Sequence, residues 1–518
     1  MVDPLAKNMG SSDCSLNELL SVVGCGPLSQ QNPSIKNIVL DSRQVSTGSL
    51  FVAIKGSAVD GREYIGAAIR AGAVAVIAES KSFSVEYFDN VVIINIENLC
   101  EKLGLIASKF FGDPSEKMHV VAVTGTNGKT TCAQLLQQLF QLLGKKSATI
   151  GTMGYGADLS LLVSTGLTTP DAVTCQRILK QLLDDGVECV AMEVSSHAIA
   201  QCRHGGIQFE GAVFTNLSRD HLDYHGSMGD YAEIKASLFQ STEHKFVITN
   251  LDDDVGAGSI RDAVPETVDC FGYGLKTKKG NRGFEGGSVF AGELDFSEKG
   301  ICGHVDSCWG EGELSSQLIG QFNAYNLLAV ISTACASGYS LVEVLEKVPL
   351  LEPIEGRMQK VQVAGDIVVI IDYAHTPDAL EQALKAAREH TAKKLWVLFG
   401  CGGDRDKGKR PQMAAIAEEY ADNIVVTSDN PRMEDPKRII EDILAGFSSV
   451  DKIITEPDRA AAIYWAVNQA ASGDMVLFAG KGHEKYQLVQ GEKLSFSDYD
   501  TASSALRMRA QKNAGGLQ

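Results

Sequence analysis

Short apolar segments alternate with amphipathic helical segments through most of this sequence. Residues 120–123, 188–193, 211–215 and 245–250 are predicted to be buried strands, and helical periodicity fills the stretches between them. A second series of the same kind is predicted at residues 367–372, 395–400, 423–427 and 475–479. Because strands that alternate with helices form mostly parallel sheets covered on both faces, the sequence predicts an α/β protein with two such sheets.

The rest of the chain has a looser pattern. Strands at 37–41, 48–54 and 73–78 and helices at 64–71 and 100–110 are predicted before the first sheet, and residues 252–318 suit a peripheral antiparallel sheet. A helix is predicted to begin near residue 320 and to run to residue 336. We therefore expect three domains, at residues 1–100, 101–350 and 351–518.

Composition narrows the class of protein. Hydrophobic residues make up 44% and charged residues 22% of the 518 residues, as in soluble globular proteins, and the net charge of −18 argues against a nucleic-acid-binding surface. The twelve cysteines form no Cys-x-x-Cys pair, which favours reduced thiols in the core. Neither a signal peptide nor a membrane span is recognisable, so we expect a cytoplasmic protein, and we expect it to be a monomer.

The chemistry is clearest between His119 and Thr131. A buried strand there leads into a glycine turn and then into the start of a helix, an order in which backbone N–H groups and the helix N-terminus bind phosphate. Lys129 and Thr130 can meet the terminal phosphates and a magnesium ion. Val123 replaces the first glycine of the usual phosphate-loop pattern. We interpret the segment as a nucleoside triphosphate site formed by Gly125, Thr126, Asn127, Gly128, Lys129, Thr130 and Thr131.

Polar residues also follow the other predicted strands. Glu193 closes one strand near the phosphate loop, where a carboxylate suits magnesium, and the His221/His225 spacing suits zinc less well because the segment is predicted to be a loop. Asp41-Ser42-Arg43 and residues 56–62 can hold a diphosphate or a sugar, or serve only as turns. The asparagines at 323 and 326 can bind a base or cap a helix. Four polar loops at the strand ends of the last sheet predict another site.

Taken together, these motifs resemble those of the Mur ligases, the UDP-N-acetylmuramoyl-peptide ligases of cell-wall synthesis. The resemblance runs from Asp41-Ser42-Arg43 to Gly480-Lys481-Gly482-His483-Glu484 and includes Gly-Thr-Asn-Gly-Lys-Thr-Thr. It implies a UDP-binding domain, a central ATPase domain and a C-terminal Rossmann-like domain that brings the amino acid. It also implies that ATP phosphorylates a carboxylate and that an amine then attacks the acyl phosphate.

The resemblance implies a role for individual residues. Lys129, Lys235, Glu193 and His221 would be catalytic, and magnesium would be held by Thr130, Glu193, His221 and a carbamate on Lys235. Asn323, Arg357 and Asp372 would complete the ATP site. The acceptor, UDP-N-acetylmuramoyl-L-alanyl-D-glutamate, would contact Leu40, Ser42, Ser57, Ala58, Val59, Thr168, Thr169, Ser195, Gln201 and Arg203. Leu167 stands where the family often has asparagine, so the hydrogen bond that this asparagine would make to the substrate is absent.

Asp-Asn-Pro-Arg is the form found in family members that add meso-2,6-diaminopimelate. The amino acid would contact Arg405, Asp429, Asn430, Pro431, Arg432, Gly480 and Glu484. An arginine can bind the distal carboxylate, which lysine lacks, with two hydrogen bonds, whereas the alternative is a turn in which Arg432 pairs with Glu434 or Asp435. An L-lysine-adding ligase, a P-loop kinase and a non-catalytic nucleotide-binding scaffold remain as alternative functions.

Overall fold

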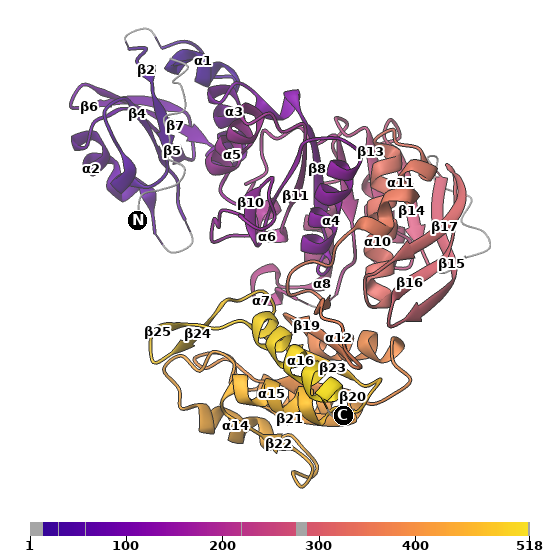
Figure 1. The fold of residues 1–518 in the computed structure, drawn as a ribbon. Helices are drawn as coiled ribbons and strands as arrows, with labels where there is room; N and C mark the ends of the chain where they lie inside the picture. The colour runs from indigo at the N-terminus through magenta and orange to yellow at the C-terminus, as the bar shows by residue number, and fades with distance from the viewer. Residues whose placement is uncertain (1–13, 29–30, 57–58, 219, 276–286, 516–518) are drawn as a thin grey trace. The chain divides into compact units, whose positions relative to one another are not determined.

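The computed structural model describes residues 14–28, 31–56, 59–218, 220–275 and 287–515. These residues form two compact units (Figure 1). The first runs as far as Tyr273 and includes Ser332–Gly338, and the second includes Val289–Ile331 and continues from Tyr339. Within the described ranges, none of the helices combines the length and the apolar character that a membrane crossing requires.

The first unit begins with a five-stranded sheet in the order β3-β4-β5-β7-β6. Side chains along β4 (Ser49–Ala53) point alternately to the two faces of the sheet, and helices cover both faces. Leu50 packs in a core with α1 (Leu16–Ser21) and α3 (Leu99–Phe110), whereas Phe51 packs in a core with α2 (Ile65–Arg70). The strands and helices predicted here are confirmed. The remaining elements are β1 (Cys14–Ser15), β2 (Ser34–Ile35), β3 (Asn37–Val39), β5 (Ala73–Ser80), β6 (Ser84–Phe88) and β7 (Val91–Glu97).

The central sheet of the first unit carries the phosphate loop. Its strands have the order β10-β9-β11-β8-β12-β13-β14, and all neighbours from β9 to β14 are parallel. The strands are β8 (His119–Thr124), β9 (Ser147–Gly151), β10 (Gly154–Gly156), β11 (Cys189–Glu193), β12 (Gly211–Phe214), β13 (Phe246–Asn250) and β14 (Asp269–Gly274). The helices are α4 (Lys129–Leu142), α5 (Ala172–Asp184), α6 (Ser196–Ala200), α7 (Leu222–His225), α8 (Met228–Ser237) and α9 (Arg261–Ala263).

Two predictions for this part of the chain are wrong. Residues 252–318 are not uniformly antiparallel, because β14 pairs parallel with β13; the helical turns at Gly256–Ile260 and in α9 form the crossover that parallel pairing requires. Residues 222–225 form the short helix α7 rather than a loop, since His221 takes a left-handed conformation with φ of 54° immediately before it.

The second unit holds three antiparallel strands and a doubly wound sheet. The antiparallel strands β15 (Gly287–Ser297), β16 (Gly300–Ser307) and β17 (Gly310–Ser316) confirm the predicted peripheral sheet. The long helix α10 (Gln321–Ala336) and α11 (Leu341–Lys347) follow. The doubly wound sheet has the order β18-β19-β23-β20-β21-β22, with β18 antiparallel and the other strands parallel.

Helices cover both faces of the doubly wound sheet. Along β23 (Met475–Ala479), Leu477 packs in the core shared with α12 and α13, while Phe478 packs in the core shared with α15 and α16, which lie side by side in Figure 1. The predicted strands of this sheet are confirmed. The other elements are β18 (Gln359–Lys360), β19 (Val368–Asp372), β20 (Leu395–Phe399), β21 (Asn423–Val426), β22 (Ile454–Thr455), β24 (Tyr486–Val489), β25 (Glu492–Ser495), α12 (Pro377–Glu389), α13 (Lys409–Tyr420), α14 (Pro436–Leu444), α15 (Arg459–Gln469) and α16 (Asp498–Gly515).

The cysteines are divided between core and surface. All twelve are free thiols. Burial is confirmed for Cys132, Cys175, Cys189, Cys270, Cys335 and Cys401, but the prediction of core thiols is wrong for Cys302 and Cys308, which are exposed.

Candidate active site

The phosphate loop forms the predicted strand-turn-helix between β8 and α4. Gly125 has φ of 148°, and a Cβ there would lie 1.9 Å from Thr215 Oγ1, so a side chain is excluded by close packing as well as by backbone conformation. The Thr126 N–H donates to Asn216 O and the Asn127 N–H donates to Asn216 Oδ1. These two N–H groups are therefore occupied, and the N–H groups of the first turn of α4 are the ones placed to bind phosphate.

Val123 explains why the loop departs from the usual glycine spacing. It is the last but one residue of β8, it is fully buried, and it pairs in register with Glu193 of β11. The strand therefore continues through the position where many phosphate loops have already begun to turn.

Lys129, the first residue of α4, folds back over the loop. Its Nζ donates to Gly125 O at 2.9 Å and to Thr126 O at 2.8 Å. The side chain is therefore held beside the helix N-terminus, where its charge would meet the phosphate oxygens of a nucleotide.

Glu193 lies at the end of β11 with only 2% of its surface exposed. It accepts hydrogen bonds from Thr130 Oγ1 at 3.0 Å, from the Thr152 N–H at 2.9 Å and from Thr152 Oγ1 at 3.1 Å. All of these donors are neutral, and a buried carboxylate is costly unless a cation balances it. Glu193 and Thr130 thus form an oxygen-rich pair that fits magnesium.

Lys235 is buried beneath the loop, with 1% of its surface exposed. Its Nζ donates to Gly125 O at 2.9 Å and to Thr124 Oγ1 at 3.3 Å, so it shares the Gly125 carbonyl with Lys129. Burial and the neighbouring Lys129 charge lower the pKa of Lys235 well below its usual value. A neutral amine at this position is consequently favoured.

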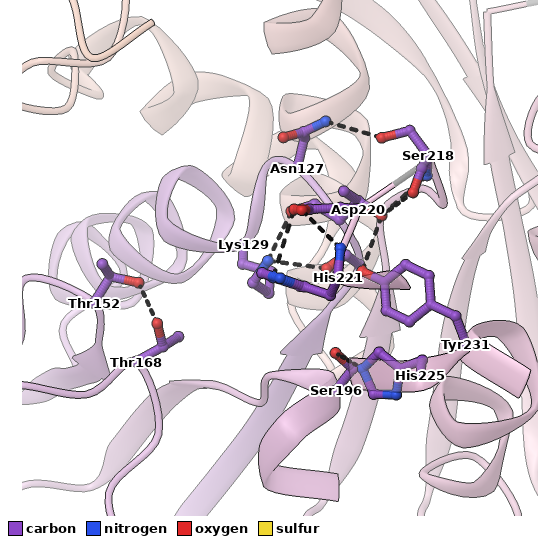
Figure 2. Close-up of polar contacts among 12 residues, drawn as sticks. Asn127, Lys129, Thr152, Thr168, Ser196, Ser218, Asp220, His221, His225 and Tyr231 are labelled. Carbon is purple, nitrogen blue, oxygen red and sulfur yellow. Dashed lines mark hydrogen bonds and ion pairs between the residues drawn. The ribbon is translucent and has the colours of Figure 1, made fainter. Parts of the chain in front are cut away.

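His221 belongs to an aromatic cluster beside the loop. Its ring centroid lies 4.8 Å from that of His197, and His197 in turn contacts Tyr224 at 4.3 Å and His225 at 5.3 Å. His225 Nε2 bonds Ser196 Oγ at 2.9 Å, as Figure 2 shows. Among the described residues no three His, Cys, Asp or Glu side chains gather closely enough to hold a metal ion by themselves.

The predicted acceptor residues of the central domain come together next to Glu193. Thr169 Oγ1 donates to Glu193 O at 2.9 Å and accepts from the Ser195 N–H, while Arg203 Nη1 donates to Thr169 O at 3.1 Å. Arg203 Nε also donates to Gln201 Oε1 at 3.0 Å. The Ser195 hydroxyl caps α6 by accepting from the Ala198 N–H.

A threonine that the sequence analysis did not single out connects these residues to the phosphate loop. Thr152 Oγ1 lies 3.1 Å from Thr168 Oγ1 (Figure 2) and bonds Glu193. Tyr231 was missed as well; its hydroxyl lies 3.2 Å from Thr126 Oγ1. Neither residue belongs to a motif that reveals such a contact.

The two N-terminal loops show the same turn chemistry. Asp41 accepts from the Arg43 N–H and pairs with the Arg43 guanidinium, and Asp60 does the same with Arg62. Leu40 precedes the first of these turns, Ser42 lies within it, and Val59 is exposed at the second. Ser57 and Ala58 lie outside the described residues.

Three predicted ATP contacts belong to the second unit. Asn323 is buried within α10, where Nδ2 donates to Ile319 O and Oδ1 accepts from Asn326, so its side chain does not cap the helix. Asp372, at the end of β19, accepts from the Met358 and Ala374 N–H groups, and its removal from water raises its pKa. Arg357 lies over the ring of Tyr373 at 5.2 Å.

The four strand-end loops of the doubly wound sheet meet as predicted. Arg432 Nη1 donates to Gly403 O at 2.8 Å, and Asn430 Nδ2 donates to Glu484 Oε2 at 2.8 Å. Lys409 Nζ donates to His375 O, which joins the first loop to the second.

Close packing also brings Gly480 against Asp429: a Cβ on Gly480, which has φ of 114°, would lie 2.6 Å from Asp429 Oδ2. Pro431 lies between Asn430 and Arg432, and Arg405 bonds the carbonyl of Asp404. Arg432 does not pair with Glu434 or Asp435; the salt bridges of Glu434 are to Arg410 and Lys407. The surface-turn alternative therefore does not describe Arg432.

Buried cations beneath these loops were not recognised in the sequence. Lys481 Nζ, fully buried, bonds Asn430 Oδ1 and Glu484 Oε2. Arg459 pairs with Asp498 and donates to Ser428 O and Ala479 O, the residues that precede Asp429 and Gly480. The sequence around Arg459 and Lys481 gives no indication that either side chain is buried and paired with a carboxylate.

Comparison with known proteins agrees with this architecture. Residues 34–111 match the Mur ligase family catalytic domain, residues 123–334 the Mur ligase middle domain, and residues 356–482 the Mur ligase glutamate ligase domain. A Vibrio vulnificus protein named UDP-N-acetylmuramoyl-L-alanyl-D-glutamate--2,6-diaminopimelate ligase is 45% identical over 91% of this chain and 94% of its own. A Coxiella burnetii protein of the same name is 44% identical over 91% and 96%.

Solved structures are similar over most of the chain. A structure of a protein with that same ligase name has a TM-score of 0.74 at 35% identity and covers 96% of this chain and 99% of its own. A MurF ligase from Thermotoga maritima in complex with ADP has a TM-score of 0.57 at 20% identity, covers 92% and 98%, and shares the fold. With this extent of similarity and the three matching domains, the chain belongs to the Mur ligase family.

Proposed function

We propose that this chain is an ATP-dependent ligase that joins meso-2,6-diaminopimelate to the D-glutamyl side-chain carboxylate of UDP-N-acetylmuramoyl-L-alanyl-D-glutamate, releasing ADP and phosphate. The observation that carries the proposal is that one chain combines a phosphate loop with an arginine-bearing site built from Gly402–Arg405 and Asp429–Arg432. A kinase needs the first of these sites and has no use for the second. The relatives that carry this ligase name span nearly the whole chain.

The reaction divides into two steps. A carboxylate oxygen of the acceptor attacks the γ-phosphorus and ADP leaves; the amine nitrogen of the amino acid then attacks the acyl carbon, loses a proton, and phosphate leaves. Lys129 and the N–H groups at the start of α4 bind the phosphate oxygens and stabilise the charge that develops on them. Asn323, Arg357 and Asp372 are proposed to hold adenine, phosphate and ribose, respectively.

Magnesium would be held by Thr130, Glu193, His221 and a carbamate on Lys235, and when bound it neutralises phosphate charge. For the carbamate, the neutral Lys235 nitrogen attacks carbon dioxide and releases one proton. The low pKa of Lys235 supports this step, since only the unprotonated amine is nucleophilic. The nearby Lys129 ammonium would stabilise the resulting anion.

The acceptor is proposed to contact Leu40, Ser42 and residues 57–59 with its UDP group. Thr168, Thr169, Ser195, Gln201 and Arg203 would contact its sugar-peptide part. The hydrogen bonds that join Thr168, Thr152 and Glu193 support a short path between this acceptor site and the phosphate loop. The domain boundaries at 100 and 350, the cytoplasmic location and the monomeric state stay predictions.

Phosphate release, measured with each substrate omitted in turn, tests the proposal. The ligase requires ATP, the UDP-linked acceptor and diaminopimelate together for turnover. A kinase would release ADP with a single acceptor and form a stable phosphoproduct, and a scaffold would bind ATP without turnover. Continued ADP formation in the absence of diaminopimelate would contradict the proposal.

A further inference from the structure

Arg410, the second residue of α13, is a charged side chain with no exposed surface. Its guanidinium bonds two carboxylates, donating from Nη1 and Nη2 to Glu434 at 3.1 and 3.0 Å and from Nη1 to Asp442 at 2.7 Å. Nη2 also donates to the carbonyl of Gly402 at 3.3 Å. One buried cation therefore contacts the loop after β20, the loop after β21 and helix α14.

Glu434 extends this contact to the backbone beside Arg405. The oxygen that Arg410 Nη2 binds also accepts from the Asp404 N–H at 2.6 Å. The hydrogen bonds from Arg410 lower the pKa of Glu434 to about 2, so the carboxylate is ionised throughout the working range of an enzyme. The charge pair consequently stays intact at any pH at which the protein is assayed.

The two loops are bonded to each other at the same place. Asp404 Oδ2 accepts from the Met433 N–H at 3.1 Å, and Arg432 Nη1 donates to Gly403 O at 2.8 Å. Asp404 and Arg432 both have φ of 53°, a left-handed conformation that non-glycine residues adopt only when surrounding contacts maintain it. Arg410 and Glu434 supply part of those contacts.

The geometry points to Arg410 as a positioning residue for amino-acid specificity: through Glu434 and the Gly402 carbonyl it holds the loop of Arg405 against the loop of Arg432, so that both arginines can bind the distal carboxylate of the incoming amino acid. This inference rests on the proposed function. Arg410 itself, having no exposed surface, does not touch the amino acid.

Replacement by lysine separates a positioning role from a merely structural one. Arg410→Lys keeps the positive charge, but an ammonium cannot bind both Glu434 oxygens and the Gly402 carbonyl in one plane. We expect the KM for meso-diaminopimelate to rise about 10-fold or more, with kcat and the KM values for ATP and for the acceptor within about 2-fold of wild type. Arg388→Lys, which alters the exposed Arg388–Asp422 pair of the same domain, is the matched control and should change none of these values.

Glu434→Gln is a second variant that tests the positioning role even if the Arg410 variants do not fold. We expect it to raise the same KM, and the double variant to be no worse than the worse single variant, because both act through one contact. An unchanged KM for diaminopimelate in a folded variant would overturn the inference, as would an equal loss in all kinetic constants. The wild type separates failure of this inference from failure of the proposed function. If the proposed function were wrong, the wild type would not consume diaminopimelate at all.

Discussion

The phosphate loop and the proposed amino-acid site are held in shape by different means. In the phosphate loop, Lys129 and Lys235 donate to the same Gly125 carbonyl, and burial together with the Lys129 charge lowers the pKa of Lys235. In the amino-acid site the buried cations are already neutralised: Arg410 by Glu434 and Asp442, Arg459 by Asp498, and Lys481 by Glu484.

This contrast indicates which of the two sites changes more when its ligand binds. A loop that holds the Lys129 ammonium beside a helix N-terminus gains stability when anionic phosphate binds. A site built on paired, buried charges is already organised before the ligand binds, so its contribution is selectivity. The experiments below test this contrast, beginning with the largest expected effect.

The largest effect is expected on amino-acid choice. The wild type should prefer meso-diaminopimelate to L-lysine by roughly 10⁴-fold in kcat/KM, because lysine leaves the carboxylate-binding arginines without a partner. Arg432→Ala should lower this preference by about 10²-fold or more. Arg438→Ala, an exposed arginine on α14, is the control. Equal use of both amino acids by the wild type, or an Arg432→Ala enzyme with the full preference, would place the selectivity elsewhere.

Next in size is the loss of nucleotide chemistry. Lys129→Ala should reduce ATP turnover by about 10³-fold while leaving the fold intact, because the lysine charge matters most as charge develops on the transferring phosphoryl group. The measurement is phosphate release with all substrates present, with circular dichroism as the check on folding. Lys180→Ala, on the exposed side of α5, should be unaffected. If Lys129→Ala turned over ATP at the wild-type rate, the role of Lys129 in phosphoryl transfer would be contradicted.

A smaller effect is expected on stability when the support of the amino-acid site is broken. Asp498→Asn leaves the Arg459 charge buried without a carboxylate and should cost about 3 kcal/mol. The urea midpoint can be followed through Trp396 and Trp465, whose rings are 6.0 Å apart in this core. Lys385→Ala, which breaks an exposed pair with Glu381, should cost about 0.5 kcal/mol or less. Equal losses in the two variants would contradict the buried-charge explanation.

The smallest effect is a gain in stability at the phosphate loop. The pKa of Lys235 is lowered in the folded state, so the unfolded chain binds more protons and the buried lysine costs stability at neutral pH. Lys235→Met should therefore raise the melting temperature by about 3 °C at pH 7 in carbonate-free buffer. Wild-type stability rises with pH towards the ordinary lysine pKa of about 10.4, so the gain should shrink at pH 10. A gain that grows with pH would contradict the assigned shift.

The carbamate itself has a direct test that does not depend on turnover. Carbon-13-labelled bicarbonate should give a carbamate signal in wild-type protein that Lys235→Met lacks, while Lys180→Ala retains it. A wild-type spectrum identical to that of Lys235→Met would contradict the modification.

The sequence alone was enough to predict the elements that depend on the pattern of neighbouring residues. The strand-turn-helix around Gly125–Thr131, four of the parallel strands in each of the two parallel sheets, and the meeting of four polar loops at one sheet edge follow from periodicity and from the rule that the carboxyl ends of parallel strands share an edge. The family resemblance came from the same contiguous motifs.

The contacts that the residues of these motifs make with distant parts of the chain became known only from the tertiary structure. The parallel pairing of β14, the path from Thr168 through Thr152 to Glu193, and the contacts of Arg410 and Arg459 join residues far apart in the chain. The physical reason is that burial and charge pairing depend on which segments meet in space, whereas propensity and periodicity reflect only near neighbours. An arginine at the start of α13 has the same local pattern whether it faces water or, as Arg410 does, is buried against Glu434, Asp442 and the Gly402 carbonyl.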